Sequence, residues 1–509
     1  MQDLKSVLSV RAMCSKSKAV FLLRAATLGL PADCHMPGMC RHVYSSAVFG
    51  FSGKLSEKQL SRLQKCLPRA VWYRELDGVV RKAEDPVRTY GHLARLHNTK
   101  NRRLEQAQQS SFEGLSSATF NGNPFDALGN TGSTQSKSSA PQPPSDSVQT
   151  KLGDGGRIDL YNLTCGGASV NAVGNKTQWV GRNLWNLDRV DQRQLPLNDA
   201  YTYGTATSSG TGNNVTIYVV DSGVLITHQE FQKFGAPPGT SRASYGFDFI
   251  DNKKEAGDCD GHGTIVAGIA AGLQVGIAKD AEIVSVRILD CSGSGTISNT
   301  VAALDWVATN AKKPAVVTLS LGVQEGSWSR VLDDAVRNLI NKQGITVIVA
   351  AGNSALDACN VAPANVPEAI TVAATSVDDE YNRTQASVQE YSSALETMYT
   401  WSNTGPRIDI FAPGVNIYSA CGAPSRCAVL NNSSYTVSSG TSMAAPLVAG
   451  VAAVYLSTNG QAQPSDVSST IVSEATVGVV NASEFMQGTP NRLIFSKIVA
   501  KNVAAAGGP

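Results

Sequence analysis

Residues 315–351 read AVVTLSLGVQEGSWSRVLDDAVRNLINKQGITVIVAA and contain the pattern that decides the fold. Two β-branched runs, 315–321 and 345–351, are apolar on both faces, as expected for strands that are covered on both sides. The segment 329–344 between them carries apolar residues at helical spacing. A strand, a helix and a second strand in this order predict a parallel pair joined by a right-handed crossover.

The same alternation continues on both sides of this stretch. Further apolar runs are NVTIYVV (214–220), AEIVSVRIL (281–289) and AITVAA (369–374), and helix-like segments between the runs are TIVAGIAAGL and SNTVAALDWVATNA. The alternation predicts an α/β domain over residues 183–498, with a mostly parallel central sheet. In such sheets the chemistry is expected at the carboxyl ends of the strands.

Composition narrows the classes of partner. The chain has 509 residues, 42% of them hydrophobic and 17% charged, and its net charge is +2. So small a net charge gives no reason to expect nucleic acid or an anionic membrane surface as a partner. No window approaches 18 uninterrupted apolar residues, so no membrane span is expected.

The front of the chain divides into two regions. Residues 17–82 predict a small α+β domain, with strand-like stretches at 42–55 and 70–81 around an amphipathic helix at 56–67. Residues 83–182 include a long stretch rich in Gln, Ser, Asn, Gly and Pro, which predicts a flexible linker.

Cysteines and sequons indicate a secretory setting. Six of the ten cysteines lie at or beyond Cys165, and N-x-S/T sequons recur along the chain. The apolar stretch 18–31 is interrupted by Arg24 and makes a poor signal peptide. A secreted or extracellular protein without a clear signal peptide is therefore expected.

Three residues suggest nucleophilic catalysis. Asp221 follows the first apolar run in an Asp-Ser-Gly turn, His262 lies in the glycine-flanked loop CDGHGTIVAG, and Ser442 lies in SGTSMAAP (439–446), which leads into an apolar helix. A serine hydroxyl needs an imidazole to take its proton, and a carboxylate to orient that imidazole. His228, the other histidine of this domain, lies among surface-like polar residues and is interpreted as structural.

The order of the three residues excludes one alternative. Lipase-like and esterase-like enzymes on an α/β sheet carry their triad as Ser, Asp or Glu, then His, with the serine in G-x-S-x-G. Here no histidine follows Ser442, and the serine lies in Gly-Thr-Ser-Met-Ala.

With these blocks the chain resembles the subtilisin-like serine proteases, most closely the proteinase K and aqualysin branch. The further blocks that carry the resemblance are LWNLDRVDQRQLPLNDAYTY (184–203), VRILDCSGSG (286–295), AAGN (350–353), NTGPRIDIFAPG (403–414) and TPNRLIFSKI (489–498). The resemblance covers about 315 residues and implies the three-layer subtilisin-like fold. Residues 42–82 resemble the inhibitory propeptide of these enzymes, whose tail occupies the active-site cleft; an independent binding domain is the alternative.

The resemblance implies a role for each site residue. Ser442 would be the nucleophile, His262 the general base and acid, Asp221 its orienting carboxylate, and Asn353 the side-chain donor of the oxyanion hole. An extended substrate would lie between two backbone segments and fill a pocket with Gly and Ala walls, which suits aliphatic or aromatic side chains. The substrate-binding residues would be Gly293, Ser294, Gly295, Ser320, Leu321, Gly322, Ala350, Ala351 and Gly352.

Disulfides and a metal site also follow from the resemblance. Cys259 and Cys291 would form a disulfide. Cys359 has a paired counterpart in the family, but Arg407 stands at the position expected for its partner. Cys421 and Cys427 could close a short local loop. No cofactor is expected for catalysis, but a structural calcium ion is implied, with Asp409 as carboxylate ligand and the carbonyl groups of Pro367 and Ala369; a capping role for Asp409 is the alternative.

The chain departs from the family in places. Ile265 and Leu447 replace histidines that lie outside the triad, and Val323 replaces a glycine beside the cleft. We therefore expect a secreted, monomeric serine endopeptidase zymogen, acting on protein or peptide substrates and inhibited by its own propeptide. The alternatives are a catalytically silent peptide-binding relative and a processing protease of narrow specificity. The segments Ser292–Gly295 and Ser320–Gly322 contain no acidic residue that would indicate recognition of basic sites.

Overall fold

The computed structural model describes ten segments of the chain. They are residues 40–44, 50–53, 78–82, 169–170, 176–204, 209–233, 235–323, 328–377, 396–427 and 429–496. All of them belong to one compact unit, formed by Met1–Pro86 together with Asn162–Pro509.

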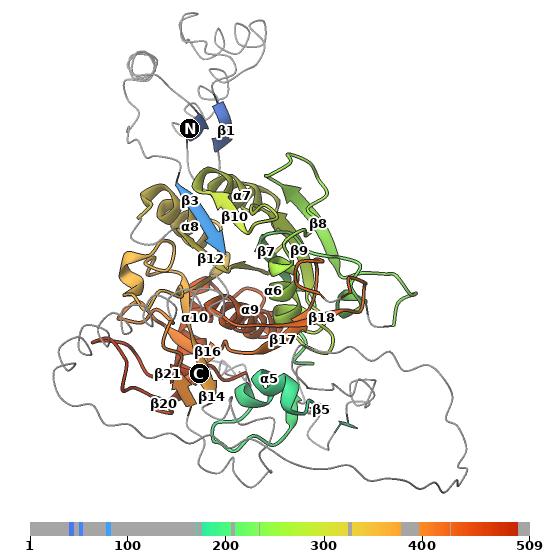
Figure 1. The fold of residues 1–509 in the computed structure, drawn as a ribbon, viewed down its shortest axis with the longest axis vertical. Helices are drawn as coiled ribbons and strands as arrows, with labels where there is room; N and C mark the ends of the chain where they lie inside the picture. Colours follow the sequence, from blue (N-terminus) through green and yellow to red (C-terminus); the bar gives the residue numbers. More distant parts are fainter. Residues whose placement is uncertain are drawn as a thin grey trace, which may run out of the picture. The chain divides into compact units, whose positions relative to one another are not determined.

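A central sheet of 11 strands organises this unit (Figure 1). Its main path runs β19 (Thr476–Val477), β21 (Arg492–Leu493), β16 (Ile410–Pro413), β14 (Ile370–Val377), β13 (Thr346–Ala350), β11 (Ala315–Leu319), β7 (Thr216–Asp221), β9 (Glu282–Arg287) and β8 (Ala243–Asp248). All neighbours from β21 to β8 are parallel, and β19 is antiparallel to β21. The five apolar runs of the sequence are confirmed as β7, β9, β11, β13 and β14.

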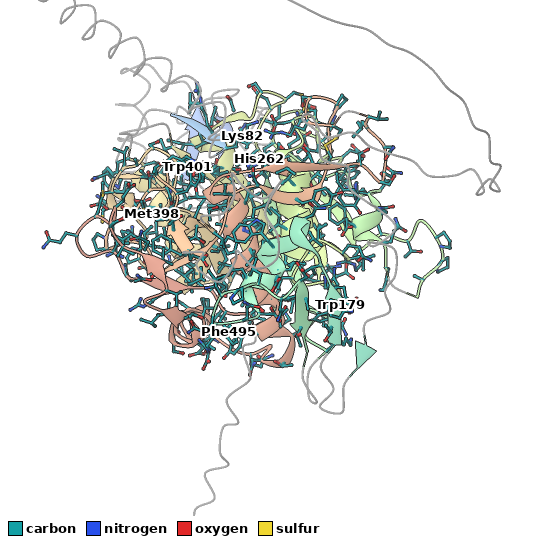
Figure 2. The ribbon with its side chains drawn as sticks, turned by 60° about the horizontal axis from the view of Figure 1, so that its bottom comes forward. Lys82, Trp179, His262, Met398, Trp401 and Phe495 are labelled. Atoms are coloured by element: carbon teal, nitrogen blue, oxygen red, sulfur yellow. A yellow bond between two sulfur atoms is a disulfide. The ribbon has the colours of Figure 1, made fainter. Side chains whose placement is uncertain are left out.

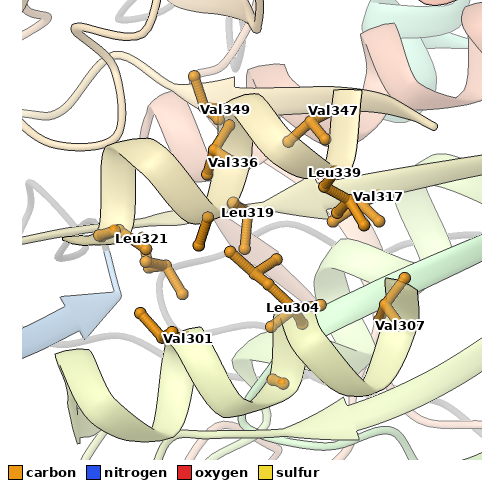
Figure 3. Packing of buried hydrophobic residues seen from close by; sticks show 14 of the residues in the cluster. Val301, Leu304, Val307, Val317, Leu319, Leu321, Val336, Leu339, Val347 and Val349 are labelled. Atoms are coloured by element: carbon orange, nitrogen blue, oxygen red, sulfur yellow. The ribbon is translucent and has the colours of Figure 1, made fainter. Parts of the chain in front are cut away.

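Two layers of helices cover the sheet. On one face α7 (Ile297–Asn310) and α8 (Arg330–Asn341) bury their apolar sides against alternate residues of the strands, as the period of two requires. Figure 3 shows this packing, in which Leu304 and Leu339 of the helices meet Val317 and Leu319 of β11. On the other face α6 (His262–Ala271) and α9 (Thr441–Thr458) contact the sheet and each other, and α10 (Pro464–Glu474) contacts α9.

Helix α9 is a core helix. Its 18 residues are long and apolar enough to span a membrane by length and composition, but 78% of that window is buried inside the protein. It contacts β11, β13, β14 and β16. Packing against the sheet accounts for its apolar character.

The front of the chain differs in part from the expectation. The stretch 42–55, expected as one strand, instead overlaps two strands, β1 (Cys40–Tyr44) and β2 (Gly50–Gly53), which pair antiparallel. The strand expected over 70–81 has its described part at β3 (Val79–Lys82). The helix expected at 56–67 lies outside the described residues.

The expected end of the linker at residue 182 is too late. Strands β4 (Ser169–Val170) and β5 (Lys176–Trp179) lie within the predicted linker, and β5 pairs with β6 (Ala200–Tyr203) of the large domain. Backbone pairing, which does not require apolar side chains, orders Lys176–Trp179 despite its polar sequence. The remaining predicted linker, 83–168, lies outside the described residues.

Several short elements complete the unit. They are the turns η3 (Arg182–Leu184), η4 (Gln229–Phe231) and η5 (Ala358–Asn360), helix α5 (Trp185–Val190), and strands β10 (Ser294–Thr296), β12 (Leu321–Val323), β15 (Glu396–Met398), β17 (Ile417–Ala420), β18 (Tyr435–Ser438) and β20 (Val480–Asn481). Strand β15 extends the sheet beside β14, and buried Glu396 of this strand pairs with Arg189.

Candidate active site

Asp221 and His262 meet at the carboxyl end of β7. Asp221 is the last residue of that strand, and His262 is the first residue of α6. Asp221 Oδ1 lies 2.8 Å from His262 Nδ1, and both side chains are almost fully buried. This contact makes Nδ1 the protonated ring nitrogen and leaves Nε2 as an acceptor. Among the described residues, Nε2 has no hydrogen-bond partner.

A partly buried carboxylate, that of Asp258, holds the histidine loop in place. Asp258 Oδ1 accepts hydrogen bonds from the backbone N of Gly261 at 2.7 Å and from Ser222 Oγ at 3.0 Å. Its Oδ2 accepts from Thr264 Oγ1 at 2.6 Å and Thr264 N at 3.0 Å. Asp258 thereby ties the start of α6 to the turn after Asp221. Burial raises the pKa of Asp258, although these hydrogen bonds oppose the rise.

Ser442 lies in the first turn of α9. Its hydroxyl donates to the carbonyl oxygen of Ser320 at 3.0 Å, and Ser320 Oγ donates to the carbonyl oxygen of Ser442 at 3.1 Å. Four residues further on is Pro446, which has no N–H to donate to the Ser442 carbonyl in the helical pattern. The proline of SGTSMAAP therefore frees this carbonyl oxygen to bond Ser320.

The side-chain amide of Asn353 is oriented by Thr441. Asn353 Oδ1 accepts from Thr441 N and from Thr441 Oγ1, both at 2.9 Å. With two donors on the oxygen, the amide cannot be turned over, and Nδ2 lies at the opposite end. Thr441 Oγ1 also accepts from Gly352 N at 3.1 Å. The residue before Ser442 thus fixes the proposed oxyanion donor.

The two predicted substrate segments are present as strand edges, and the chain's own β3 lies between them (Figure 1). Strand β3 pairs antiparallel with β10 on one side and β12 on the other. Val80 of β3 is fully buried and packs in the apolar cluster that contains Val323. Val323, which replaces a family glycine, therefore contributes to an apolar site for the residue at this strand position.

The walls of the predicted specificity pocket come from β12 and from the end of β13. Leu321, Ala350 and Ala351 are buried. Gly352 has φ +103°, and a Cβ there would lie 2.4 Å from Asn403 Nδ2, so only glycine fits. Asn403 also donates to the Ala351 carbonyl at 2.8 Å and so supports this wall.

Two disulfides flank the histidine loop. Cys259 bonds to Cys291, which ties the residues before His262 to the segment that leads into β10. Cys421 bonds to Cys427 and closes a loop of six residues' separation. Cys359 is a free thiol.

The predicted calcium ligands offer oxygen atoms only. Asp409 Oδ2 accepts from Thr371 N at 2.8 Å, and burial raises the pKa of Asp409 to about 6 although that hydrogen bond, Arg407 and Arg492 oppose the rise. A divalent cation beside this carboxylate would favour its ionised form. Together with the carbonyl groups of Pro367 and Ala369, the donor set fits calcium chemistry. Within the described segments, no group of three or more His, Cys, Asp or Glu side chains could hold a metal ion.

The sequence did not single out three residues that hold the site in place, and it gave the wrong surroundings for His228. Asp258, Asp260 and Thr441 all lie within one to four residues of a member of the candidate triad, and that proximity was the available signal. Asp260 contributes because its Oδ1 accepts from the backbone N of His262 at 3.2 Å. His228 is structural as expected, but it is fully buried rather than surface-like. Its Nε2 bonds the Ser434 carbonyl at 2.8 Å, and its Nδ1 accepts from Glu230 N at 3.2 Å.

Comparison with known proteins places this geometry in context. Residues 212–489 match the family described as the subtilase family. Alkaline serine exoprotease A of Vibrio alginolyticus is 41% identical over 340 residues, covering 67% of this chain and 54% of that protein. Extracellular serine proteinase of Thermus sp. (strain Rt41A) is 44% identical over 313 residues, covering 61% of this chain and 66% of that protein.

Structure comparison agrees with the sequence matches. A solved structure described as a cold adapted subtilisin-like serine proteinase shares 40% sequence identity, with a TM-score of 0.51, and the match covers 62% of this chain and 98% of that one. The chain spans less than two thirds of the length of the two relatives named above, 54% and 66% respectively.

Proposed function

The chain belongs to the subtilase family, and we propose that it is a serine endopeptidase whose nucleophile is Ser442. The observation that carries the proposal is the contact of 2.8 Å between His262 Nδ1 and Asp221 Oδ1 at the carboxyl end of β7. It leaves His262 Nε2, which has no hydrogen-bond partner among the described residues, as the ring nitrogen that would accept the proton of the nucleophile.

Acylation would proceed in two steps. Ser442 Oγ turns from the Ser320 carbonyl towards His262, gives its proton to Nε2 and bonds to the carbonyl carbon of the scissile peptide. Asn353 Nδ2 and the backbone N–H of Ser442 stabilise the negative oxygen that forms. The C–N bond then breaks, and His262 returns the proton to the leaving amine. Asp221 stabilises the imidazolium throughout.

Deacylation repeats the same chemistry with water. His262 Nε2 accepts a proton from the water molecule, whose oxygen bonds to the acyl carbon and forms a second oxyanion. The ester bond to Ser442 breaks, and His262 returns the proton to Ser442 Oγ. The products are a free carboxylic acid and the regenerated enzyme, and no cofactor takes part in this sequence.

The substrate would be an extended peptide. Main-chain pairing with β10 and β12 accepts many sequences, because the hydrogen bonds come from the backbone. The walls formed by Leu321, Ala350, Ala351 and Gly352 carry no charge, which supports aliphatic or aromatic side chains immediately before the scissile bond.

We also propose that the protein is a secreted zymogen. Residues 17–82 would form the inhibitory segment, residues 83–168 the connection that is removed or trimmed, and residues 169–498, which include β4 and β5, the peptidase domain. Strand β3 supports inhibition, because it lies along both substrate edges. The extracellular Thermus relative supports secretion. We expect the peptidase to act as a monomer.

A structural calcium ion is part of the proposal. Asp409 and the carbonyl groups of Pro367 and Ala369 would hold it beside the start of β14. The ion would stabilise this region, and no catalytic step depends on it.

Labelling of the recombinant full chain with a fluorophosphonate tests the proposal. We expect the label on Ser442, located by peptide mass spectrometry, and none on Ser442→Ala. Absence of label on folded protein from which the N-terminal segment has been released would contradict the enzyme proposal and would leave a silent peptide-binding relative.

A further inference from the structure

Strand β3 shows how an extended peptide sits along the two substrate edges. Lys82 lies opposite Leu321 of β12, and its backbone N donates to the Gly293 carbonyl at 3.2 Å. In an antiparallel pair, one step forward on one strand is one step back on the other. A peptide bound like β3 would therefore place its next residue opposite Ser320, whose carbonyl oxygen is 3.0 Å from Ser442 Oγ. The position of Lys82 is thus the second residue before the scissile bond.

The side chain at this position meets a carboxylate. Lys82 Nζ lies 2.6 Å from Asp260 Oδ2, and the exposed fractions of the two side chains are only 13% and 7%. The stem of Lys82 passes over Gly293, where a Cβ would lie 2.4 Å from Lys82 Cε. Figure 2 labels Lys82 beside His262, two residues from Asp260 along the chain. A glycine floor and an acidic end together form a site for a long basic side chain.

Asp260 is held in place through the carboxylate oxygen that Lys82 does not contact. Arg426 Nη2 lies 3.2 Å from Asp260 Oδ1, and Arg426 Nε donates to the Asp260 carbonyl at 3.0 Å. The disulfide Cys421–Cys427 closes the loop that carries Arg426. Burial raises the pKa of Asp260, but Arg426, Lys82 and His262 outweigh burial and hold this pKa below its usual range. The carboxylate is therefore charged at neutral pH, and its Oδ2 is the oxygen that takes the incoming cation.

From this geometry we propose that Asp260 is a specificity-determining residue, which selects lysine or arginine two residues before the scissile bond. Lys82 is the chain's own occupant of this subsite, and the bond between residues 83 and 84 is the first one cut. The inference rests on the proposed peptidase activity. It adds a preference for basic side chains, which the uncharged segments Ser292–Gly295 and Ser320–Gly322 give no reason to expect.

Four quenched fluorescent peptides test the subsite. They share one sequence, with alanine before the scissile bond, and carry Lys, Arg, norleucine or Glu at the preceding position. The enzyme is expressed as the full chain, allowed to process itself, and quantified by fluorophosphonate titration. We expect kcat/KM for the Lys and Arg peptides to exceed the norleucine value about tenfold at low salt, with Glu lowest. The ratio should fall as salt rises.

Variants assign the preference to Asp260. In Asp260→Asn, the ratio of Lys to norleucine kcat/KM should fall close to one. Glu255→Gln removes the same charge from an exposed position in the same loop and should leave the ratio unchanged. In the full chain, Lys82→Met should slow cutting at the 83–84 bond about tenfold, whereas Arg81→Met at the exposed neighbouring position should not.

The outcomes separate the two proposals. Equal cleavage of all four peptides by wild-type protein that is labelled at Ser442 would overturn the Asp260 subsite and leave the peptidase standing. An unchanged ratio in folded Asp260→Asn would also overturn the subsite. Failure to cleave any peptide, together with no label at Ser442, would refute the peptidase proposal itself.

Discussion

Ser320 and Ser442, 122 residues apart in the chain, exchange two hydrogen bonds, each from the hydroxyl of one to the carbonyl oxygen of the other, at 3.1 and 3.0 Å. The pair joins the substrate edge that begins at β12 to the helix that carries the proposed nucleophile. Pro446 makes the pairing possible, because it leaves the Ser442 carbonyl without its helical donor. The proposed substrate edge and the proposed nucleophile are thereby held at a fixed separation.

Removal of the Ser320 hydroxyl should destabilise the protein. In a Ser442→Ala background, which prevents self-digestion and keeps the carbonyl at position 442, we expect Ser320→Ala to cost about 1–3 kcal/mol of unfolding free energy. The cost arises because a buried carbonyl oxygen loses its donor. Denaturant unfolding measures it, with the exposed Ser469→Ala as control. Equal midpoints for the two variants would contradict the role assigned to the hydroxyl.

Thr441 should affect rate rather than binding. Thr441→Val keeps the shape of the side chain but removes the hydroxyl that donates to Asn353 Oδ1. With the amide less firmly oriented, we expect kcat to fall about tenfold and KM to stay nearly constant, a smaller loss than the 100- to 1,000-fold typical of removing the oxyanion donor. Thr441→Ser keeps the hydroxyl and should retain most activity. A rise in KM with unchanged kcat would show that the hydroxyl supports substrate binding instead.

Acid should destabilise the protein in part through His228. Burial lowers the pKa of His228 below its usual 6.5, although the Ser434 carbonyl and Glu230 oppose the change. Protonation would place a hydrogen on Nδ1, which accepts from Glu230 N. As pH falls below about 6.5, the unfolded chain takes up a proton that the folded protein excludes, so stability falls by up to about 1.4 kcal/mol per pH unit.

Unfolding titrations from pH 7.5 to 5 measure this effect. His228→Asn retains an oxygen that can cap Glu230 N, but it does not titrate. In the Ser442→Ala background, its stability should depend less steeply on pH just below 6.5 than that of the parent. Parallel profiles for the two proteins would assign the acid sensitivity to other groups.

Removal of calcium should lower the thermal stability of the protein, because the proposed ion is structural and takes part in no catalytic step. We expect a chelator to lower the unfolding temperature of the Ser442→Ala protein, and added calcium to restore it. Asp409→Asn should unfold at a lower temperature in calcium and should respond little to the chelator. An unfolding temperature in the parent that is indifferent to the chelator would contradict the proposed site.

The sequence by itself determined the central strands of the α/β domain and the residues of the candidate triad. The apolar runs that form β7, β9, β11, β13 and β14 could be recognised in the sequence because strands covered on both faces must be apolar throughout. Asp221 and His262 could be singled out because each follows a local rule, one at the end of a strand and the other at the start of a helix. Such rules act over a few residues and need no knowledge of packing.

Only the tertiary structure decided what depends on residues far apart in the chain. The polar composition of Lys176–Trp179 predicted a linker. This segment is a strand because its backbone pairs with β6, and composition does not reveal such pairing. Lys82 and Asp260 are 178 residues apart, and nothing near either one specifies the other. Their ion pair exists because the sheet crossovers bring β10 and β12 to either side of β3, and the register of that pairing sets which side chain reaches the carboxylate.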